Sequence, residues 1–242
     1  MNHQPRKYRN NVYKKGLYSF RVLVKETDLL VQTEIPLEEL AIRSVSEYRG
    51  YIENYIKRYP KFATTLEPWI VDGIEPAIIK DMAVCGFKAG VGPMAAVAGA
   101  VAQYVGMDLL KKSNEVIIEN GGDIFIKTHD EIILGVYAGM SPLSMKIGIK
   151  INPNNNPISV CTSSGTVGHS LSFGNADAVC VISKSCPMAD AAATAICNQV
   201  KKKSDISNAI GFGKQILNIS GVLIIMDDKV GAWGEIEIVP IS

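Results

Sequence analysis

Residues 186–195 read Cys-Pro-Met-Ala-Asp-Ala-Ala-Ala-Thr-Ala, which is the composition of a buried helix interrupted by two polar side chains. Asp190 and Thr194 are four residues apart, so on an α-helix they share one face. A carboxylate beside a hydroxyl suits a hard cation such as Mg²⁺, with backbone and phosphate oxygens completing its shell. A structural role is equally open, because an Asp in the first turn of a helix complements the helix dipole.

A glycine turn precedes this segment in the chain and lies between two apolar stretches. It reads Asn120-Gly121-Gly122-Asp123. Paired glycines permit positive φ angles and let a ligand lie against the backbone. The same residues are also common in ordinary turns, where Asn and Asp bond to their own backbone. We keep all four as candidate cofactor-binding residues.

A long uncharged segment forms the third candidate region. From Ile151 to Ala176 the chain has no Asp, Glu, Lys or Arg but is rich in hydroxyl and amide groups. Ser164, Gly165 and Thr166 would offer backbone N–H and hydroxyl donors to phosphate or ribose oxygens. His169 is a candidate proton carrier, although a single histidine more often has a structural hydrogen-bonding role.

The cysteines are odd in number and lack the CxxC and Cys/His spacings of zinc sites, so we expect free thiols in a reducing compartment. They are Cys85, Cys161, Cys180, Cys186 and Cys197. Cys161 and Cys186 adjoin the polar segments and are candidate catalytic thiols. Cys186 precedes the expected helix, where the helix N-terminus would lower a thiol pKa. The alternative is that both are unreactive small residues.

Charge and composition exclude several classes of protein. The 242 residues carry 25 Lys and Arg against 24 Asp and Glu, which gives no basic surface for nucleic acid. The run Lys201–Lys203 is interpreted as a solvated helix end. At 47% hydrophobic residues the chain can bury a full core. We expect a single domain over residues 1–242, with residues 1–16 as a peripheral basic lead.

No signal peptide or membrane span is expected. The N-terminal lead is basic and polar, without an apolar stretch behind it. Residues 89–107 carry no charge but are rich in alanine and glycine, so we interpret them as a closely packed buried helix. Small residues four apart, such as Ala95 and Gly99, would let another backbone approach. We therefore expect a cytoplasmic protein that contacts no membrane.

Hydrophobic periodicity predicts hairpins and meanders with helices between groups of strands, which is an α+β fold of mainly antiparallel sheet. The expected strands are 17–25, 29–34, 115–118, 123–127, 132–136, 145–151, 159–162, 178–183, 221–226 and 230–238. The expected helices are 37–58, 76–84, 93–105, 187–202 and 206–217.

The glycine turn, the uncharged segment and the helix with Asp190, in that order along the chain, resemble the ApbE-like superfamily, which is named for bacterial FAD:protein FMN transferases. The family has an Asn-x-Gly-Gly-Asp-like turn, here Asn120–Asp123 in compressed form, and a Ser-Gly turn, here Ser164-Gly165. Its late helix reads Ala-Asp-Ala-x-Ala-Thr-Ala, which matches Ala189–Ala195 and is the most specific of the three motifs. The order of elements matches from about residue 80 to the C-terminus.

The resemblance implies an ApbE-like fold and a Mg²⁺ site at Asp190 and Thr194, with a main-chain oxygen from residues 89–92 as third ligand. It also implies a pocket for FAD or another nucleotide, that is, for a small phosphorylated ligand. The transferases' His-x-x-Asp-Pro-x-x-Gly segment is not reproduced after His169, and no lipoprotein N-terminus is present. We therefore do not expect FMN transfer.

Two other functions remain open at this point. The closest resemblance is to a branch of anaerobic bacteria and archaea that is associated with sulfur assimilation and homocysteine formation. That association implies an accessory protein working with pocket thiols beside an iron–sulfur protein partner. The other alternative is a non-catalytic interaction subunit. A homo-oligomer is compatible with all three functions.

Overall fold

The computed structural model describes residues 14–167 and 172–241, which form an α+β fold. The helices are α1 (Glu38–Arg58), α2 (Ala77–Ala89), α3 (Val97–Leu109), α4 (Cys186–Asn198) and α5 (Ile206–Gly213). Short 3₁₀ helices are η2 (Pro60–Ala63), η3 (Pro93–Ala96) and η4 (Lys203–Asp205). The strands are β1 (Tyr18–Val24), β2 (Thr27–Thr33), β3 (Val116–Asn120), β4 (Asp123–Lys127), β5 (Ile132–Gly135), β6 (Ile147–Ile151), β7 (Ile158–Ser163), β8 (Ala178–Ser183), β9 (Gly221–Met226), β10 (Lys229–Gly234) and β11 (Glu237–Pro240).

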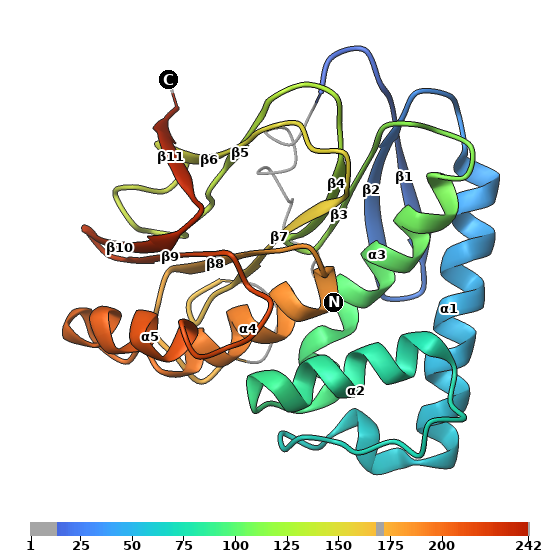
Figure 1. Cartoon of the computed structure of the whole chain (residues 1–242), viewed down its shortest axis with the longest axis horizontal. Coiled ribbons are helices and arrows are strands. Elements are labelled where there is room, and N and C mark those ends of the chain that lie inside the picture. The colour runs from blue at the N-terminus through green and yellow to red at the C-terminus, as the bar shows by residue number, and fades with distance from the viewer. Residues whose placement is uncertain (1–13, 168–171, 242) are drawn as a thin grey trace.

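An eight-stranded antiparallel sheet dominates the described part of the chain. Its strand order is β1-β2-β3-β4-β7-β8-β9-β10, and a second sheet has the order β11-β6-β5. Helices α4 and α5 lie along one side of the large sheet, and the small sheet lies on the opposite side (Figure 1). The predicted α+β class with mainly antiparallel pairing is confirmed.

The central strands are apolar on both faces because both faces are covered. In β8, Val179 and Val181 pack into the helix-side core, whereas Ala178, Cys180 and Ile182 pack into the core shared with the small sheet. Successive side chains of a strand point to opposite faces, so a run without polar residues is required where two cores meet. Cys180 is thus a small core residue, as its apolar neighbours predict.

Several helix boundaries differ from the predicted ones: α3 begins at Val97 instead of 93, α4 ends at Asn198 instead of 202, and α5 ends at Gly213 instead of 217. Helix α2 continues past Val84 to Ala89 and ends at Gly90, whose φ of 73° is left-handed. Inside this helix, position 86 requires glycine, because a Cβ there would lie 2.9 Å from the backbone oxygen of Val91. The uncharged stretch 89–107 is not one helix, since η3 separates α2 from α3.

The C-terminal strand predicted over 230–238 is wrong, because the chain breaks it at Gly234. That glycine has a φ of 86°, and a Cβ on it would lie 2.1 Å from the oxygen of Ser220. Strand β10 ends there, and β11 leaves the large sheet to pair with β6 in the small one. The positive φ angle redirects the chain from one sheet to the other.

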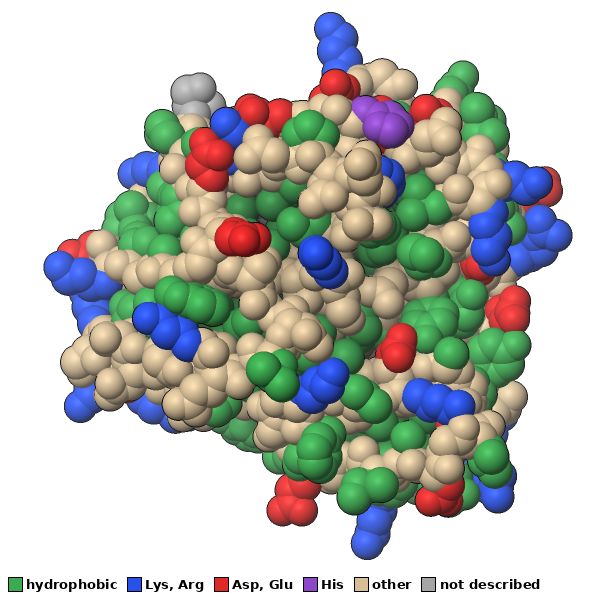
Figure 2. Space-filling model, in the orientation of Figure 1, with side chains coloured by type: hydrophobic (Ala, Val, Ile, Leu, Met, Phe, Trp, Pro, Cys, Tyr) green, Lys and Arg blue, Asp and Glu red, His purple; other side chains and the backbone are tan. Residues whose placement is uncertain are grey.

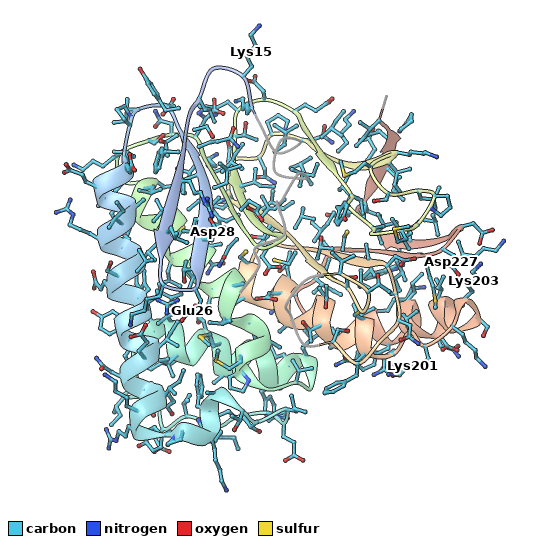
Figure 3. The ribbon with its side chains drawn as sticks, turned by 180° about the vertical axis from the view of Figure 1, so that it is seen from behind. Lys15, Glu26, Asp28, Lys201, Lys203 and Asp227 are labelled. Atoms are coloured by element: carbon cyan, nitrogen blue, oxygen red, sulfur yellow. The ribbon has the colours of Figure 1, made fainter. Side chains whose placement is uncertain are left out.

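Charges of both signs are interspersed on the face shown in Figure 2, in line with the near-neutral composition. The lysines at 201–203 are exposed and follow the end of α4. Lys203 forms ion pairs with Asp227 at 3.2 Å and with Asp228 at 2.7 Å (Figure 3). The run therefore lies at a solvated helix end, as interpreted from the sequence.

Lys14 joins the end of the N-terminal lead to the folded body. Its backbone N–H donates to Gln32 at 2.7 Å, and its ammonium group pairs with Glu115 and Asp130. Residues 1–13 of the lead lie outside the described residues. In the part of the chain that the structure describes, no helix alone has the length and apolar character of a membrane span; α2 together with residues 93–109, bent by 107°, meets the criterion by length and composition only.

Candidate functional site

Helix α4 carries the two predicted cation ligands on an otherwise buried surface. Pro187 stands in its first turn, where the missing N–H costs nothing. From Cys186 to Cys197 every residue is buried except Asp190 and Thr194, which are half-buried. Their spacing of four places both polar groups on one accessible face of the helix. The helix thus presents a carboxylate and a hydroxyl together while the rest of it packs in the core.

Helix α3 holds the start of α4 in place. The backbone N–H of Gly99 donates to Oδ2 of Asp190 at 2.9 Å. A Cβ on Gly99 would lie 2.5 Å from the backbone oxygen of Cys186, so the small residue predicted to allow close approach does allow it. The side chain of Gln103 accepts a hydrogen bond from the N–H of Cys186 at 2.8 Å. Nothing in the sequence around Gln103 signals this contact.

Asp190 therefore has a structural role as well. Gly99 lies in the first turn of α3, where backbone N–H groups lack partners within the helix. The carboxylate bonds to the backbone of Ala98 and Gly99 there and complements the dipole of α3 rather than that of its own helix. The residue joins two helices whatever else it binds.

The predicted glycine turn also contacts the first turn of α3. Gly121 and Gly122 have φ angles of 69° and 108° and connect β3 to β4 as a two-residue hairpin loop. Asn120, which precedes them, donates from its side-chain amide to the backbone oxygen of Ala98 at 3.0 Å. Because Asp190 bonds to Gly99, the glycine turn and α4 meet at the first turn of α3.

The carboxyl groups of Asp123, which is buried, and Asp190, which is half-buried, repel each other at this junction. Burial raises the pKa of Asp190 well above its usual range, and the charge of Asp123 raises it further. Burial and the proximity of Cys186 likewise raise the pKa of Asp123. Among the described residues, no group of three or more His, Cys, Asp or Glu side chains is arranged to hold a metal ion. A cation here would need hydroxyl, backbone and ligand oxygens.

The two candidate thiols are in contact. The sulfur atoms of Cys161 on β7 and Cys186 on α4 are 3.6 Å apart, and the Cys161 thiol also lies 3.4 Å from the backbone oxygen of Cys186. Both residues are fully buried. Burial raises the pKa of Cys161 well above its usual range, and contact with Cys186 adds to the rise. In this state Cys161 is a neutral thiol.

The predicted Ser-Gly turn follows β7, and its polar groups bond within the loop. Oγ of Ser164 accepts hydrogen bonds from the N–H groups of Thr166 at 3.1 Å and Val167 at 2.9 Å. Thr166 donates to Oδ1 of Asp177 at 3.0 Å. Gly165 is required as glycine, because a Cβ there would lie 1.9 Å from the oxygen of Gly174. These hydrogen bonds thus stabilise the conformation of the loop itself.

The end of β7 brings this loop toward the glycine turn. A Cβ on Gly122 would lie 3.6 Å from the backbone oxygen of Thr162, two residues before Ser164. Segments near residues 122, 162 and 190 are therefore neighbours, joined through β4, β7 and the start of α3. His169 lies outside the described residues, so its role stays a prediction. Within residues 89–92, the backbone oxygen of Gly92 accepts a hydrogen bond from the N–H of Ala95 at 3.1 Å, and a third cation ligand from this segment stays a prediction.

Comparison with known proteins identifies the family of the chain. A family model described as AbpE bacteria matches residues 9–214. A UPF0280 protein of Methanococcus aeolicus is 45% identical over 202 residues, covering 81% of this chain and 82% of the relative. A UPF0280 protein of Methanocaldococcus jannaschii is 40% identical over 226 residues, covering 89% and 90%.

Solved structures show the same fold. The apo form of the flavinyl transferase ApbE of Pseudomonas stutzeri matches with a TM-score of 0.53 at 14% identity, covering 90% of this chain and 94% of that one. The ApbE protein of Thermotoga maritima matches with a TM-score of 0.53 at 12% identity, covering 89% and 96%. The family match and the relatives together show that the chain belongs to the AbpE bacteria family, as an ApbE-like branch.

Proposed function

We propose that the chain binds a Mg²⁺ ion and a phosphate-bearing nucleotide of the flavin type at the junction of α4, α3 and the glycine turn. The proposal rests on the burial pattern of α4. Among residues 186–197, only Asp190 and Thr194 are half-buried, and all the others are buried. Helix propensity favours alanine over threonine at position 194, so the hydroxyl there calls for another cause, whereas the Asp190 carboxylate also caps α3.

The residues present fit such a cation. Mg²⁺ prefers hard oxygen ligands and keeps several positions for water or phosphate. Asp190 and Thr194 supply a carboxylate and a hydroxyl from one helix face. A bound cation would also offset the repulsion between Asp190 and Asp123, which raises the pKa of Asp190. When bound, the ion would neutralise phosphate charge and orient the ligand.

The chain's own residues would do the remaining work of binding. Gly121 and Gly122 carry no side chains, so a ligand can approach their backbone. Ser164 and Thr166 stand in a loop whose backbone already turns sharply. The name of the Pseudomonas stutzeri protein, a flavinyl transferase, supports a flavin-type ligand. Because the Asp-Pro pair expected after His169 is missing, we propose binding without FMN transfer.

Calorimetric titration of the protein with FAD and with ADP, with Mg²⁺ present and then with EDTA, tests this proposal. We expect binding of at least one of the two that is lost with EDTA and in Asp190→Asn. Asp72→Asn, at an exposed position, is the matched control and should bind like the parent. If neither nucleotide binds with Mg²⁺ present, the proposal is wrong.

A second function, thiol chemistry in sulfur assimilation, is favoured by the 3.6 Å contact between the Cys161 and Cys186 sulfurs. A polysulfide donor would transfer one sulfane sulfur to a thiol and leave a persulfide on the protein. Mass spectrometry after polysulfide treatment, under conditions without oxygen, tests it. A sulfur adduct on Cys161 or Cys186 supports this function, and an adduct-free pair rejects it. The iron–sulfur partner would be sought by copurification.

A further inference from the structure

The contact between Cys161 and Cys186 joins two elements that are distant in sequence. Cys161 lies in the middle of β7, and Cys186 is the first residue of α4, 25 positions later. Their sulfur atoms are 3.6 Å apart. A disulfide bond has an S–S length of about 2.05 Å. The two sulfur atoms must therefore move closer together before a bond can form.

The thiol pair lies close to a partly exposed side chain. Both thiols are fully buried, but Asp190 stands one helical turn beyond Cys186 and is half-buried. Solvent therefore comes within one turn of the thiol pair.

We propose that Cys161 and Cys186 are a redox pair that a small peroxide closes into an intramolecular disulfide, linking β7 to the first residue of α4. One thiol sulfur attacks a peroxide oxygen, the thiol proton passes to the leaving hydroxide as the O–O bond breaks, and a sulfenic acid and water form. The second sulfur attacks the sulfenic sulfur, the S–O bond breaks, and a second water leaves. The two thiols lose two electrons in all, and hydrogen peroxide gains them.

The cross-link would fix the N-terminal end of α4 to the large sheet. The backbone oxygen of Cys186 packs closely against Gly99 and has little room to move toward it, since a Cβ on Gly99 would lie only 2.5 Å from that oxygen. Its N–H is held by Gln103 at 2.8 Å. The backbone around Cys186 is thus held on two sides, so closure depends on side-chain rotation and on movement of β7.

Intact-mass measurement on the whole folded chain tests the pair. The reduced protein, freed of reductant, is treated with hydrogen peroxide in slight excess, then unfolded and alkylated without reductant. We expect a mass lower by two hydrogen atoms before alkylation and three alkylated thiols after it, which is the five cysteines minus the bonded pair. Peptide mapping should find Cys161 linked to Cys186, and dithiothreitol should restore all five thiols.

Matched alanine variants decide which thiols react. Cys85→Ala should still lose two thiols, whereas Cys161→Ala and Cys186→Ala should lose none to a disulfide. The proposal is overturned if all five thiols of the parent protein remain, if the linked peptides contain another cysteine, or if the pair gains oxygen atoms without linking. Should an alanine variant fail to fold, as judged by circular dichroism, the peptide map of the parent protein decides alone.

Discussion

Gly99 on α3 and Asp190 on α4 are joined by a hydrogen bond of 2.9 Å from a backbone N–H to a carboxylate oxygen, where a Cβ on Gly99 would lie 2.9 Å from the Cβ of Asp190. The two helices are therefore in backbone contact at the residue that the sequence marks as a cation ligand. The Asp190 carboxylate caps α3 and also lies on the half-buried face of α4. Stability and binding can be separated at this residue.

Asp190→Asn should separate them. An amide oxygen can still accept the Gly99 bond, and removal of the charge ends the repulsion with Asp123, so the free energy of unfolding without Mg²⁺ should change by less than about 1 kcal/mol. Asp190→Ala loses the acceptor and should cost about 1–2 kcal/mol. Both variants should lose any stabilisation by Mg²⁺. Urea unfolding with and without the ion measures this, and a Mg²⁺ response retained by Asp190→Asn would reject the assignment.

Gly99→Ala should destabilise the fold by about 1–3 kcal/mol, because the new Cβ would overlap the backbone oxygen of Cys186. Gly50→Ala in α1 is the matched control, since a Cβ there meets nothing within 4 Å. That change should stabilise the helix by about 0.5–1 kcal/mol. Chemical denaturation of both variants gives opposite signs if the α3–α4 contact is as close as the structure has it.

Two substitutions of Thr194 separate the effect of its hydroxyl group on Mg²⁺ binding from the effect of its branched shape. Thr194→Val keeps the branched shape and removes the hydroxyl, so Mg²⁺ affinity should fall, although by less than on loss of the Asp190 carboxylate. Thr194→Ser keeps the hydroxyl and should retain most of the affinity. Isothermal titration with Mg²⁺ and ADP ranks the variants. Equal affinities of the Val and Ser variants would show that the hydroxyl is not a ligand.

The lowered pKa of Asp108 on α3 leads us to expect that the folded protein loses stability in acid. Burial alone would raise its pKa, but hydrogen bonds from Lys111 at 2.7 Å, Ser44 at 2.9 Å and Tyr48 at 3.0 Å outweigh burial and lower it. A group whose pKa is lower in the folded state stabilises above its unfolded pKa, near 3.8, and loses that contribution as pH falls through the folded value.

Asp108→Asn should therefore be less stable than the parent protein near neutral pH, with the difference shrinking as the pH falls below about 4. Urea midpoints measured from about pH 7 down to about pH 3 test the trend. A difference that stays constant over that range would mean that the Asp108 charge does not contribute.

Local patterns in the sequence predict most of the elements. The bounds of β4, β8 and β9 agree with the predicted ones residue for residue, because apolar runs there end at turn residues such as Gly122 and Asp227. Helix α1 begins one residue after the predicted start. Such features depend on neighbours in sequence, which periodicity and turn chemistry reveal.

Local sequence patterns do not predict the long-range contacts. The pairing of β11 with β6 joins residues 237–240 to 147–150, and no local pattern indicates the partner. The sulfur contact between Cys161 and Cys186 depends on the same kind of packing. The Gly99 bond to Asp190 also lies beyond the sequence, and without it Asp190→Ala would be expected to cost only the lost dipole interaction, about 0.3–1 kcal/mol.

The central claim is that the Asp190 and Thr194 face of α4 holds a divalent cation, and Mn²⁺ in place of Mg²⁺ tests it most directly. Crystals of the protein grown with Mn²⁺ and ADP would be measured for anomalous scattering. We predict a manganese peak within ligand distance of the Asp190 carboxylate and the Thr194 hydroxyl that is absent in Asp190→Asn. No peak at these residues, or an unchanged peak in the variant, would contradict the claim.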